Sequence, residues 1–148
     1  MGLKLKDLSG TVVGVDTAIF IYFIEEHPAY LPVLLPLFDE VAAGKRTIVT
    51  SGITLLEVLV VPLRVGSLAL AERYETLLTR SRGVDFVDVS REQLRTAAQL
   101  RALYDVRTPD ALQLAAALSR ECATFLTNDR PLPQFPGLRV LQLGECLT

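Results

Sequence analysis

Two acidic residues directly follow short segments that have the composition of buried strands. Asp16 comes after residues 11–15, a run rich in β-branched residues, and Asp129 closes a stretch that begins with the strand-like segment 123–126. The role of a helix N-cap would explain Asp16, and a turn before a proline would explain Asp129. Carboxylates at the ends of strands can also bind a metal ion, so both interpretations stay open.

Glu57 is the only charged residue in the apolar segment 51–61. Helical spacing predicts that it shares one face with Ile53, Leu56, Val60 and Val61. A carboxylate on an apolar helix face is costly unless it is paired with a cation or binds a metal. The sequence therefore leaves two interpretations of Glu57, an ion pair with Arg64 and a metal ligand.

Asp110 lies at the predicted start of an apolar helix. Thr108 is expected as the N-cap and Pro109 as the first helical residue, which places Asp110 in the first turn, where acids are favourable. Residues 111–118 are apolar nearly all round the helix, apart from Gln113, which predicts that the helix is buried. Asp110 would then be fixed at the end of a central element.

The four carboxylates together point to a metal-dependent reaction. Converging carboxylates repel one another unless a cation lies between them, and oxygen ligands suit hard divalent ions such as Mg²⁺ or Mn²⁺. Thr127 and Asn128, next to Asp129, add further oxygen atoms that could bind metal or position water. The chemistry that uses such a cluster without His or Cys is the hydrolysis of phosphodiesters.

The elements that must position these residues alternate along the chain. The pattern predicts strands at 11–15, 47–50, 84–89, 123–126 and 138–141, and helices at 17–26, 32–43, 51–61, 68–80, 90–104 and 108–121. This alternation is typical of an α/β three-layer sandwich with a mainly parallel central sheet. In such sheets ligands bind beyond the carboxyl ends of the strands. We expect a single domain over residues 1–148.

Composition restricts the possible functions. Half of the 148 residues are hydrophobic, and 15 basic residues against 17 acidic ones give a net charge of −2, which argues against binding nucleic acid by bulk charge. Without the four proposed ligands, 13 acidic residues remain against 15 basic ones, a net charge of +2. Two cysteines and one histidine, widely spaced, argue against a disulfide framework or a zinc site. We expect a cytoplasmic protein without a signal peptide or a membrane span.

Four segments together resemble the PIN-domain family, and within it the VapC-type toxins of toxin–antitoxin pairs. They are Val15-Asp16-Thr17, the helix 53–58 with Glu57, the segment 108–115 that begins Thr-Pro-Asp, and Leu126-Thr-Asn-Asp129. Their order and spacing carry the resemblance, which extends over about residues 12–142. Gln113 departs from the pattern, since relatives often have His there, a position that is not expected to bind metal.

The resemblance implies a ribonuclease that depends on Mg²⁺ or Mn²⁺ and cleaves single-stranded or looped RNA. The fold would be PIN-like, with a five-stranded parallel sheet. The acidic quartet that holds metal and activates water would be Asp16, Glu57, Asp110 and Asp129. Thr17 and Thr127 would help to orient metal, water or phosphate. The resemblance also implies a homodimer and a cognate antitoxin protein.

Other functional classes lack their motifs. A receiver domain needs a second acid beside Asp16 and a late lysine, a haloacid-dehalogenase-type phosphatase needs Asp-x-Asp, and the Gly-rich phosphate loops are absent from the sequence. Two alternatives remain. One is a non-catalytic PIN-like module that binds RNA or protein, and the other is a PIN nuclease of RNA processing outside toxin–antitoxin systems.

Overall fold

A five-stranded parallel sheet forms the centre of the molecule. The structure, a computed structural model, describes residues 5, 8–128 and 132–147. The sheet has the strand order β3-β2-β1-β4-β5, and every neighbouring pair of strands is parallel. Its strands are β1 (Val12–Val15), β2 (Thr47–Ser51), β3 (Val84–Val87), β4 (Thr124–Thr127) and β5 (Arg139–Gln142). The predicted α/β fold with a parallel sheet of five strands is confirmed.

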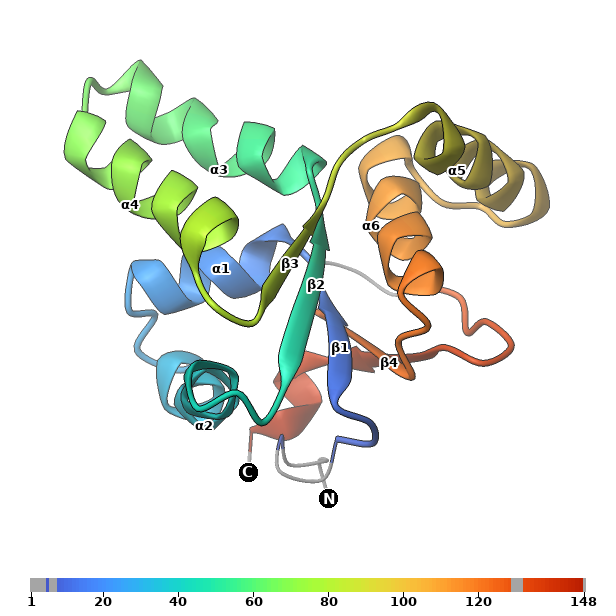
Figure 1. Ribbon diagram of the computed structural model, residues 1–148, viewed down its shortest axis with the longest axis horizontal. Helices are drawn as coiled ribbons and strands as arrows, with labels where there is room; N and C mark the ends of the chain where they lie inside the picture. The colour runs from blue at the N-terminus through green and yellow to red at the C-terminus, as the bar shows by residue number, and fades with distance from the viewer. Residues whose placement is uncertain (1–4, 6–7, 129–131, 148) are drawn as a thin grey trace.

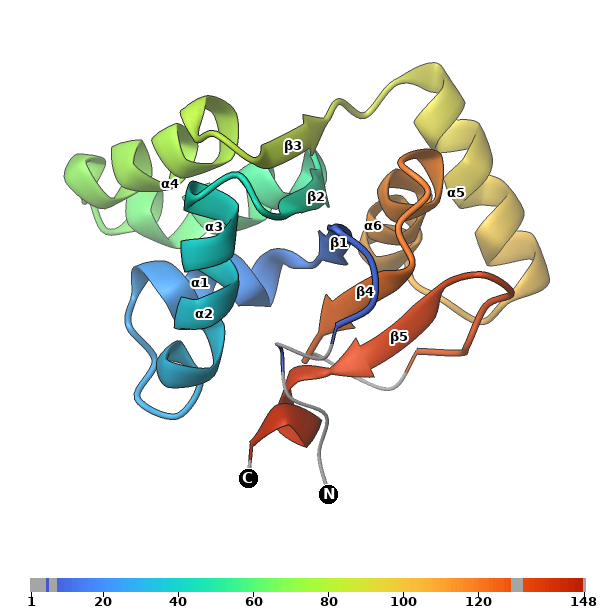
Figure 2. The ribbon, with the colours of Figure 1, turned by 60° about the horizontal axis from the view of Figure 1, so that its bottom comes forward.

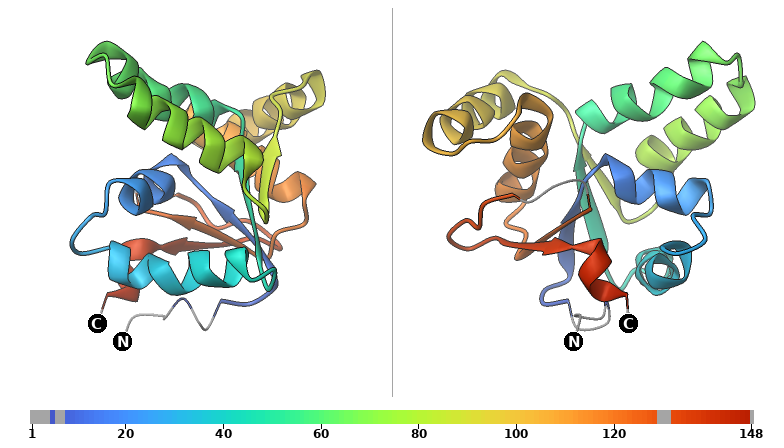
Figure 3. Two further views of the ribbon diagram at one scale, coloured as in Figure 1. Left: turned by 60° about the vertical axis from the view of Figure 1, so that its left-hand side comes forward. Right: turned by 180° about the vertical axis from the view of Figure 1, so that it is seen from behind.

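Helices cover both faces of the sheet and make three layers (Figures 1 and 2). One face carries α1 (Thr17–Ile24), α2 (Leu31–Ala42), α3 (Ile53–Arg64) and α4 (Leu68–Arg80). The other face carries α5 (Arg91–Leu103) and α6 (Thr108–Ser119). The 3₁₀ helix η2 (Leu143–Cys146) follows β5. The views in Figure 3 show the hairpin of α3 and α4 extending outward on one side of the sheet.

Two apolar cores lie on opposite faces of the sheet. Because side chains alternate along a strand, Ile48 packs into the core with α1 to α4, whereas its neighbour Val49 packs into the core with α5 and α6. Leu126 and Phe125 on β4 divide in the same way. This two-sided burial explains why the strands read as continuous apolar runs in the sequence.

Gly14 lets α6 pack closely on the centre of the sheet. A Cβ atom at this position would lie 2.9 Å from Cβ of Ala117 and 3.0 Å from Cδ1 of Phe125. Real Cβ atoms do not approach other atoms this closely, so any larger residue would force β1 and α6 apart. Gly14 thereby lets the last turn of α6 pack directly against β1.

The predicted elements are present, with shifts of a few residues at their ends. Helix α3 begins two residues later than predicted and continues through Pro62 to Arg64. Thr108 is the first residue of α6 rather than its N-cap, since Arg107 occupies the cap position. The Thr108 hydroxyl instead accepts a 2.9 Å hydrogen bond from Nη1 of Arg101 on α5. Ser90 is the N-cap of α5, and its Oγ accepts a hydrogen bond from the Gln93 backbone N–H.

Both cysteines are buried free thiols, Cys122 in the segment between α6 and β4 and Cys146 in η2. Across residues 5, 8–128 and 132–147, no helix combines the length and the apolar character needed to cross a bilayer.

Candidate active site

The carboxyl ends of β1, β2 and β4 meet at one edge of the sheet, with β1 in the middle. Asp16 directly follows β1, Ser51 ends β2 and Thr127 ends β4. Helix α3 starts from the end of β2, and α6 begins at the same edge of the sheet (Figure 1). The parallel topology therefore gathers residues that are far apart in sequence.

Asp16 is buried at the centre of this edge, with 6% of its surface exposed. Its backbone takes the N-cap position of α1, but its side chain makes no capping hydrogen bond. Oδ2 of Asp16 instead accepts a hydrogen bond from the hydroxyl of Thr127 at the end of β4. The carboxylate is thus directed toward the edge of the sheet rather than to the start of its own helix, and the N-cap interpretation does not account for it.

Glu57 reaches the site from the second turn of α3. Its Oε1 accepts a 2.6 Å hydrogen bond from the Thr17 hydroxyl, which connects α3 to the first residue of α1. No ion pair joins Glu57 to Arg64 within the described chain, so the structural interpretation with Arg64 as its partner is wrong.

The apolar face predicted around Glu57 is not the buried face of α3. The residues buried along this helix are Thr54, Val58 and Pro62, spaced by four. Leu56 and Val61, which flank Glu57 on the predicted face, are 61% and 58% exposed. The apolar composition of α3 concealed which side packs on the protein, because apolar residues occupy nearly its whole circumference.

Asp110 enters the site from the first turn of α6. The turn begins with Arg107 as the N-cap and carries Pro109 at a position where no backbone N–H is needed. Asp110 is half-buried, and the positive end of the helix dipole favours its carboxylate there. Arg107 is exposed and lies beside the same pocket as Asp110.

A small pocket of about 50 Å³ brings three of the four predicted acids together. Its lining consists of Asp16, Thr17, Glu57, Arg107, Pro109, Asp110 and Gln113. The carboxylates come from the end of β1, from α3 and from α6. The uncharged polar groups of the lining are the Thr17 hydroxyl and the Gln113 amide. Arg107 supplies a single positive charge at its border.

The three carboxylates of this pocket suit a hard divalent cation, because such ions prefer oxygen ligands. Within residues 5, 8–128 and 132–147, however, no three His, Cys, Asp or Glu side chains are close enough to form a metal site by themselves. The fourth predicted acid, Asp129, lies outside the described residues.

The two other predicted supporting residues near β4 have different surroundings. Thr127 is buried and bonds directly to Asp16. The amide of Asn128 donates to the Tyr22 hydroxyl at 3.3 Å and accepts from the Gly144 backbone N–H at 2.9 Å. Asn128 therefore joins β4 to α1 and η2, and it does not line the pocket.

Sequence reasoning missed the polar residues beneath the pocket. Gln113, Thr54 and Thr50 are almost fully buried and hydrogen-bonded to one another. A signal was present in the sequence, since Gln113 is the one polar side chain within the otherwise apolar segment 111–118. The sequence pattern alone indicates only that Gln113 is not expected to bind metal.

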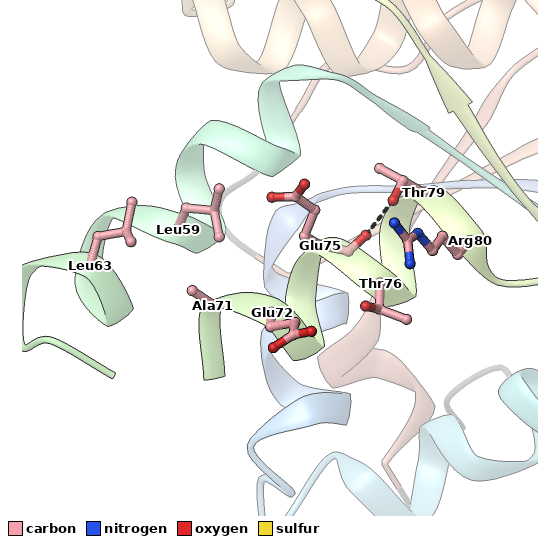
Figure 4. Close-up of a pocket in the computed structure, with 8 residues that line it drawn as sticks. All are labelled: Leu59, Leu63, Ala71, Glu72, Glu75, Thr76, Thr79 and Arg80. Atoms are coloured by element: carbon pink, nitrogen blue, oxygen red, sulfur yellow. Dashed lines mark hydrogen bonds between the residues drawn. The ribbon is translucent and has the colours of Figure 1, made fainter. Parts of the chain in front are cut away.

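A larger cleft lies elsewhere, between α3 and α4, with a volume of about 390 Å³. Figure 4 shows its polar side chains along α4, including Glu72, Glu75 and Arg80, with Leu59 and Leu63 facing them from α3. The Thr79 hydroxyl donates to the Glu75 carbonyl of its own helix at 2.7 Å. None of the predicted site residues lines this cleft, so we place the candidate active site at the smaller pocket.

Comparison with known proteins finds relatives of this fold. The family model of the PIN domain matches residues 13–138. A VapBC2 complex from Rickettsia felis, bound to a DNA fragment of its promoter, contains a similar chain with a TM-score of 0.66 and 20% identity. That match covers 88% of this chain and 98% of the other. No curated protein sequence matches the chain.

Two further solved structures have the same fold. A toxin–antitoxin complex from Klebsiella pneumoniae matches with a TM-score of 0.62 and 21% identity, over 87% of this chain and 95% of the other. VapC20 from Mycobacterium tuberculosis, described as a toxin that cleaves the sarcin-ricin loop, matches with a TM-score of 0.61 and 18% identity. This alignment covers 77% of the present chain and 86% of VapC20.

Proposed function

Since this chain belongs to the PIN-domain family, we propose that it is a metal-dependent endoribonuclease and the toxin of a toxin–antitoxin pair. The observation that carries the proposal is the pocket at the carboxyl edge of the sheet, where Asp16, Glu57 and Asp110 meet from three separate elements. A group of acids at this edge, without a His or Cys nucleophile, suits phosphodiester hydrolysis. The substrate is single-stranded or looped RNA, and the products carry 5′-phosphate and 3′-hydroxyl ends.

Mg²⁺ or Mn²⁺ would be held by Asp16, Glu57, Asp110 and Asp129. When bound, the ion supplies a water of lowered pKa and neutralises charge that develops on the phosphate. The residues of the chain contribute the rest. Thr127 holds the Asp16 carboxylate, and Thr17 holds that of Glu57, so that neither turns away to solvent.

Arg107 is the residue that we assign to the RNA backbone. It is exposed at the border of the pocket, whereas Arg64 lies at the last turn of α3 and does not line it. A guanidinium group binds phosphate oxygens through two parallel hydrogen bonds. Arg107 would therefore draw one phosphate of the RNA toward the acids.

The experiment that tests the activity is an RNA cleavage assay with the purified chain. Cleavage is expected with Mg²⁺ or Mn²⁺, and we expect it to disappear with EDTA and in the variant Asp16→Asn. Cleavage that survives both controls would overturn the metal mechanism. RNA binding without any cleavage by the native chain would favour the alternative of a non-catalytic PIN-like module.

A protein partner is the second part of the proposal. The relatives of known structure include toxin–antitoxin complexes, and α3 and the start of α4 expose apolar side chains, with Val65 and Leu68 70% and 71% exposed. We propose a cognate antitoxin, and a homodimer as the assembly of the chain itself. Inhibition of cleavage by a small protein encoded next to this chain would support the antitoxin. If the chain cleaves RNA but no such protein is encoded beside it, the alternative of a nuclease of RNA processing is favoured. Light scattering on the purified chain measures whether it is a dimer.

A further inference from the structure

A ring of buried polar side chains lies directly beneath the pocket, where β2, α3 and α6 meet. Gln113 is 3% exposed, Thr54 is completely buried and Thr50 is 1% exposed. Polar groups at such depth are costly unless they are hydrogen-bonded, and the three bond to one another. Gln113 also reaches the lining of the pocket, so the ring connects the core with the candidate active site.

The orientation of the Gln113 amide is fixed by the backbone of β2. The backbone N–H of Ser51 can only donate, and it lies 3.0 Å from Oε1 of Gln113. The oxygen atom of the amide must therefore face Ser51. The amide nitrogen then faces the hydroxyl groups of Thr54 at 2.6 Å and of Thr17 at 3.3 Å.

This orientation determines where each hydroxyl proton points. Each hydroxyl has one proton to donate, and the Thr17 and Thr54 oxygens both accept from Gln113. The Thr54 proton is directed to Thr50 at 2.7 Å, and the Thr50 proton returns to Oε1 of Gln113 at 3.3 Å, which closes the ring.

The Thr17 proton is left for the Glu57 carboxylate. Oε1 of Glu57 lies 2.6 Å from the Thr17 hydroxyl, whereas the competing Thr54 oxygen lies 3.3 Å away. A carboxylate is also the stronger acceptor, because charge assistance strengthens the bond. In the described residues, Oε2 of Glu57 accepts no hydrogen bond, so it remains for a cation.

We propose that Gln113 is a positioning residue that sets the Glu57 carboxylate through Thr17. By donating to the Thr17 oxygen, Gln113 ensures that the Thr17 proton points to Glu57 and holds that carboxylate at the pocket. The proposal rests on the proposed metal-dependent nuclease function. It explains why the buried amide of Gln113 is present, although an apolar residue at this position would avoid the free-energy cost of burying a polar group.

The test replaces Gln113 with methionine, which has a similar length but no hydrogen-bond donor. We expect the Gln113→Met variant to bind Mn²⁺ about tenfold more weakly by titration calorimetry, as is typical when a group that orients a ligand is lost. The kcat for RNA cleavage should fall, whereas the KM for RNA stays unchanged, because Gln113 is only 3% exposed and acts through Thr17.

Gln93→Met is the matched control. Gln93 on α5 is also a buried glutamine, 6% exposed. Its amide donates at 3.4 Å to the backbone carbonyl of Ala115 on α6, the helix that carries Gln113. It lies outside the polar ring and the pocket lining. Loss of a buried amide at this position should change the thermal stability but leave Mn²⁺ affinity and kcat as in the native chain.

A double mutant separates an effect through Thr17 from a general disturbance. Thr17→Val removes the proton donor, and Gln113→Met added to Thr17→Val should cause no further loss of Mn²⁺ affinity. Additive losses would overturn the proposed route. If Gln113→Met fails to fold, Gln113→Asn keeps an amide but withdraws it from Thr17 by one methylene, and it should show the same loss.

Failure of this proposal is distinguishable from failure of the proposed function. If Gln113→Met matches Gln93→Met in Mn²⁺ affinity and kcat, while Asp16→Asn abolishes cleavage, Gln113 is structural and the nuclease assignment stands. If the native chain neither binds Mn²⁺ nor cleaves RNA, the nuclease function is wrong, and the role of Gln113 in it falls as well.

Discussion

The hydroxyl of Thr17 donates a 2.6 Å hydrogen bond to Oε1 of Glu57, across 40 residues of sequence. This bond joins the first turn of α1 to the second turn of α3, which follow neighbouring strands of the sheet. It occupies one carboxylate oxygen and so limits the rotation of the Glu57 side chain. The orientation of the Glu57 carboxylate at the pocket is therefore held by Thr17, a neighbour without charge.

Glu57→Gln should abolish cleavage without unfolding the protein. The substitution removes one negative charge from a pocket with three carboxylates, which relieves repulsion, and it loses the charge needed at the site. We expect kcat/KM to fall more than about 100-fold and the melting temperature to stay equal or rise. Glu72→Gln, an exposed acid on α4, is the control and should retain activity. Unfolding of Glu57→Gln would instead identify Glu57 as a structural residue.

Thr17→Ser and Thr17→Val should separate the hydroxyl from the rest of the side chain. Serine keeps the donor to Glu57, and valine keeps the shape but removes the donor. We expect kcat to be nearly native for serine and reduced about tenfold or more for valine, since a hydrogen bond to a charged group is worth about 1.5–3 kcal/mol. Steady-state kinetics on one RNA substrate measures the difference. Equal activity of the two variants would contradict a role for the hydroxyl.

Arg107→Ala should weaken RNA binding more than catalysis. The KM for RNA should rise. The slope of log affinity against log salt concentration should become shallower by the amount that corresponds to about one lost phosphate contact. Arg64→Ala is the control, because Arg64 has the same charge but lies outside the pocket. Fluorescence anisotropy with labelled RNA at several salt concentrations provides the measurement. An unchanged slope would remove Arg107 from the RNA site.

Gly14→Ala should destabilise the fold by about 1–3 kcal/mol, the usual cost of overpacking a core. The added Cβ would lie 2.9 Å from Cβ of Ala117, so β1 and α6 would have to separate. Gly52→Ala is the control, since its nearest contacts would be 3.4 Å. Urea denaturation followed by circular dichroism measures both. A stability equal to the native value would show that α6 can shift without cost.

The Cys122 thiol should remain protonated and unreactive in the native protein at pH 8. Burial raises the pKa of Cys122 to about 11. In the unfolded chain a thiol has a pKa of about 8.5, so it deprotonates first as the pH rises. Stability should then fall above about pH 8.5, and Cys122→Ala should reduce this fall. A thiol reagent should react rapidly only after denaturant is added. Rapid reaction of the native protein would show that the helix end opens locally.

The sequence by itself determined the class of fold and predicted which acids form the candidate site. Apolar runs of strand length alternate with helical periodicity, and this local pattern predicts a parallel sheet with ligands at its carboxyl edge. Asp16 follows the first strand in the chain, so its place at that edge could be predicted from local order. Asp110 could be placed in a first turn because Pro109 marks a helix start.

The tertiary structure alone decided which side chains hold the acids in place. Helix α3 is apolar on nearly all sides, so its periodicity could not reveal that Thr54, Val58 and Pro62 are the buried residues. The bonds from Thr17 to Glu57 and from Thr127 to Asp16 join residues 40 and 111 positions apart. Such contacts depend on the strand order β2-β1-β4, which brings three strand ends together.

Gln113 shows the same division most clearly. As one polar residue in an apolar helix it was visible in the sequence, but its role was not, because its partners Ser51, Thr54 and Thr17 lie on other elements. A hydrophobic pattern along the chain predicts which residues are buried and which are exposed to water. The direction of a hydrogen bond depends on which donors and acceptors the fold places opposite each other, and only the packed structure determines that.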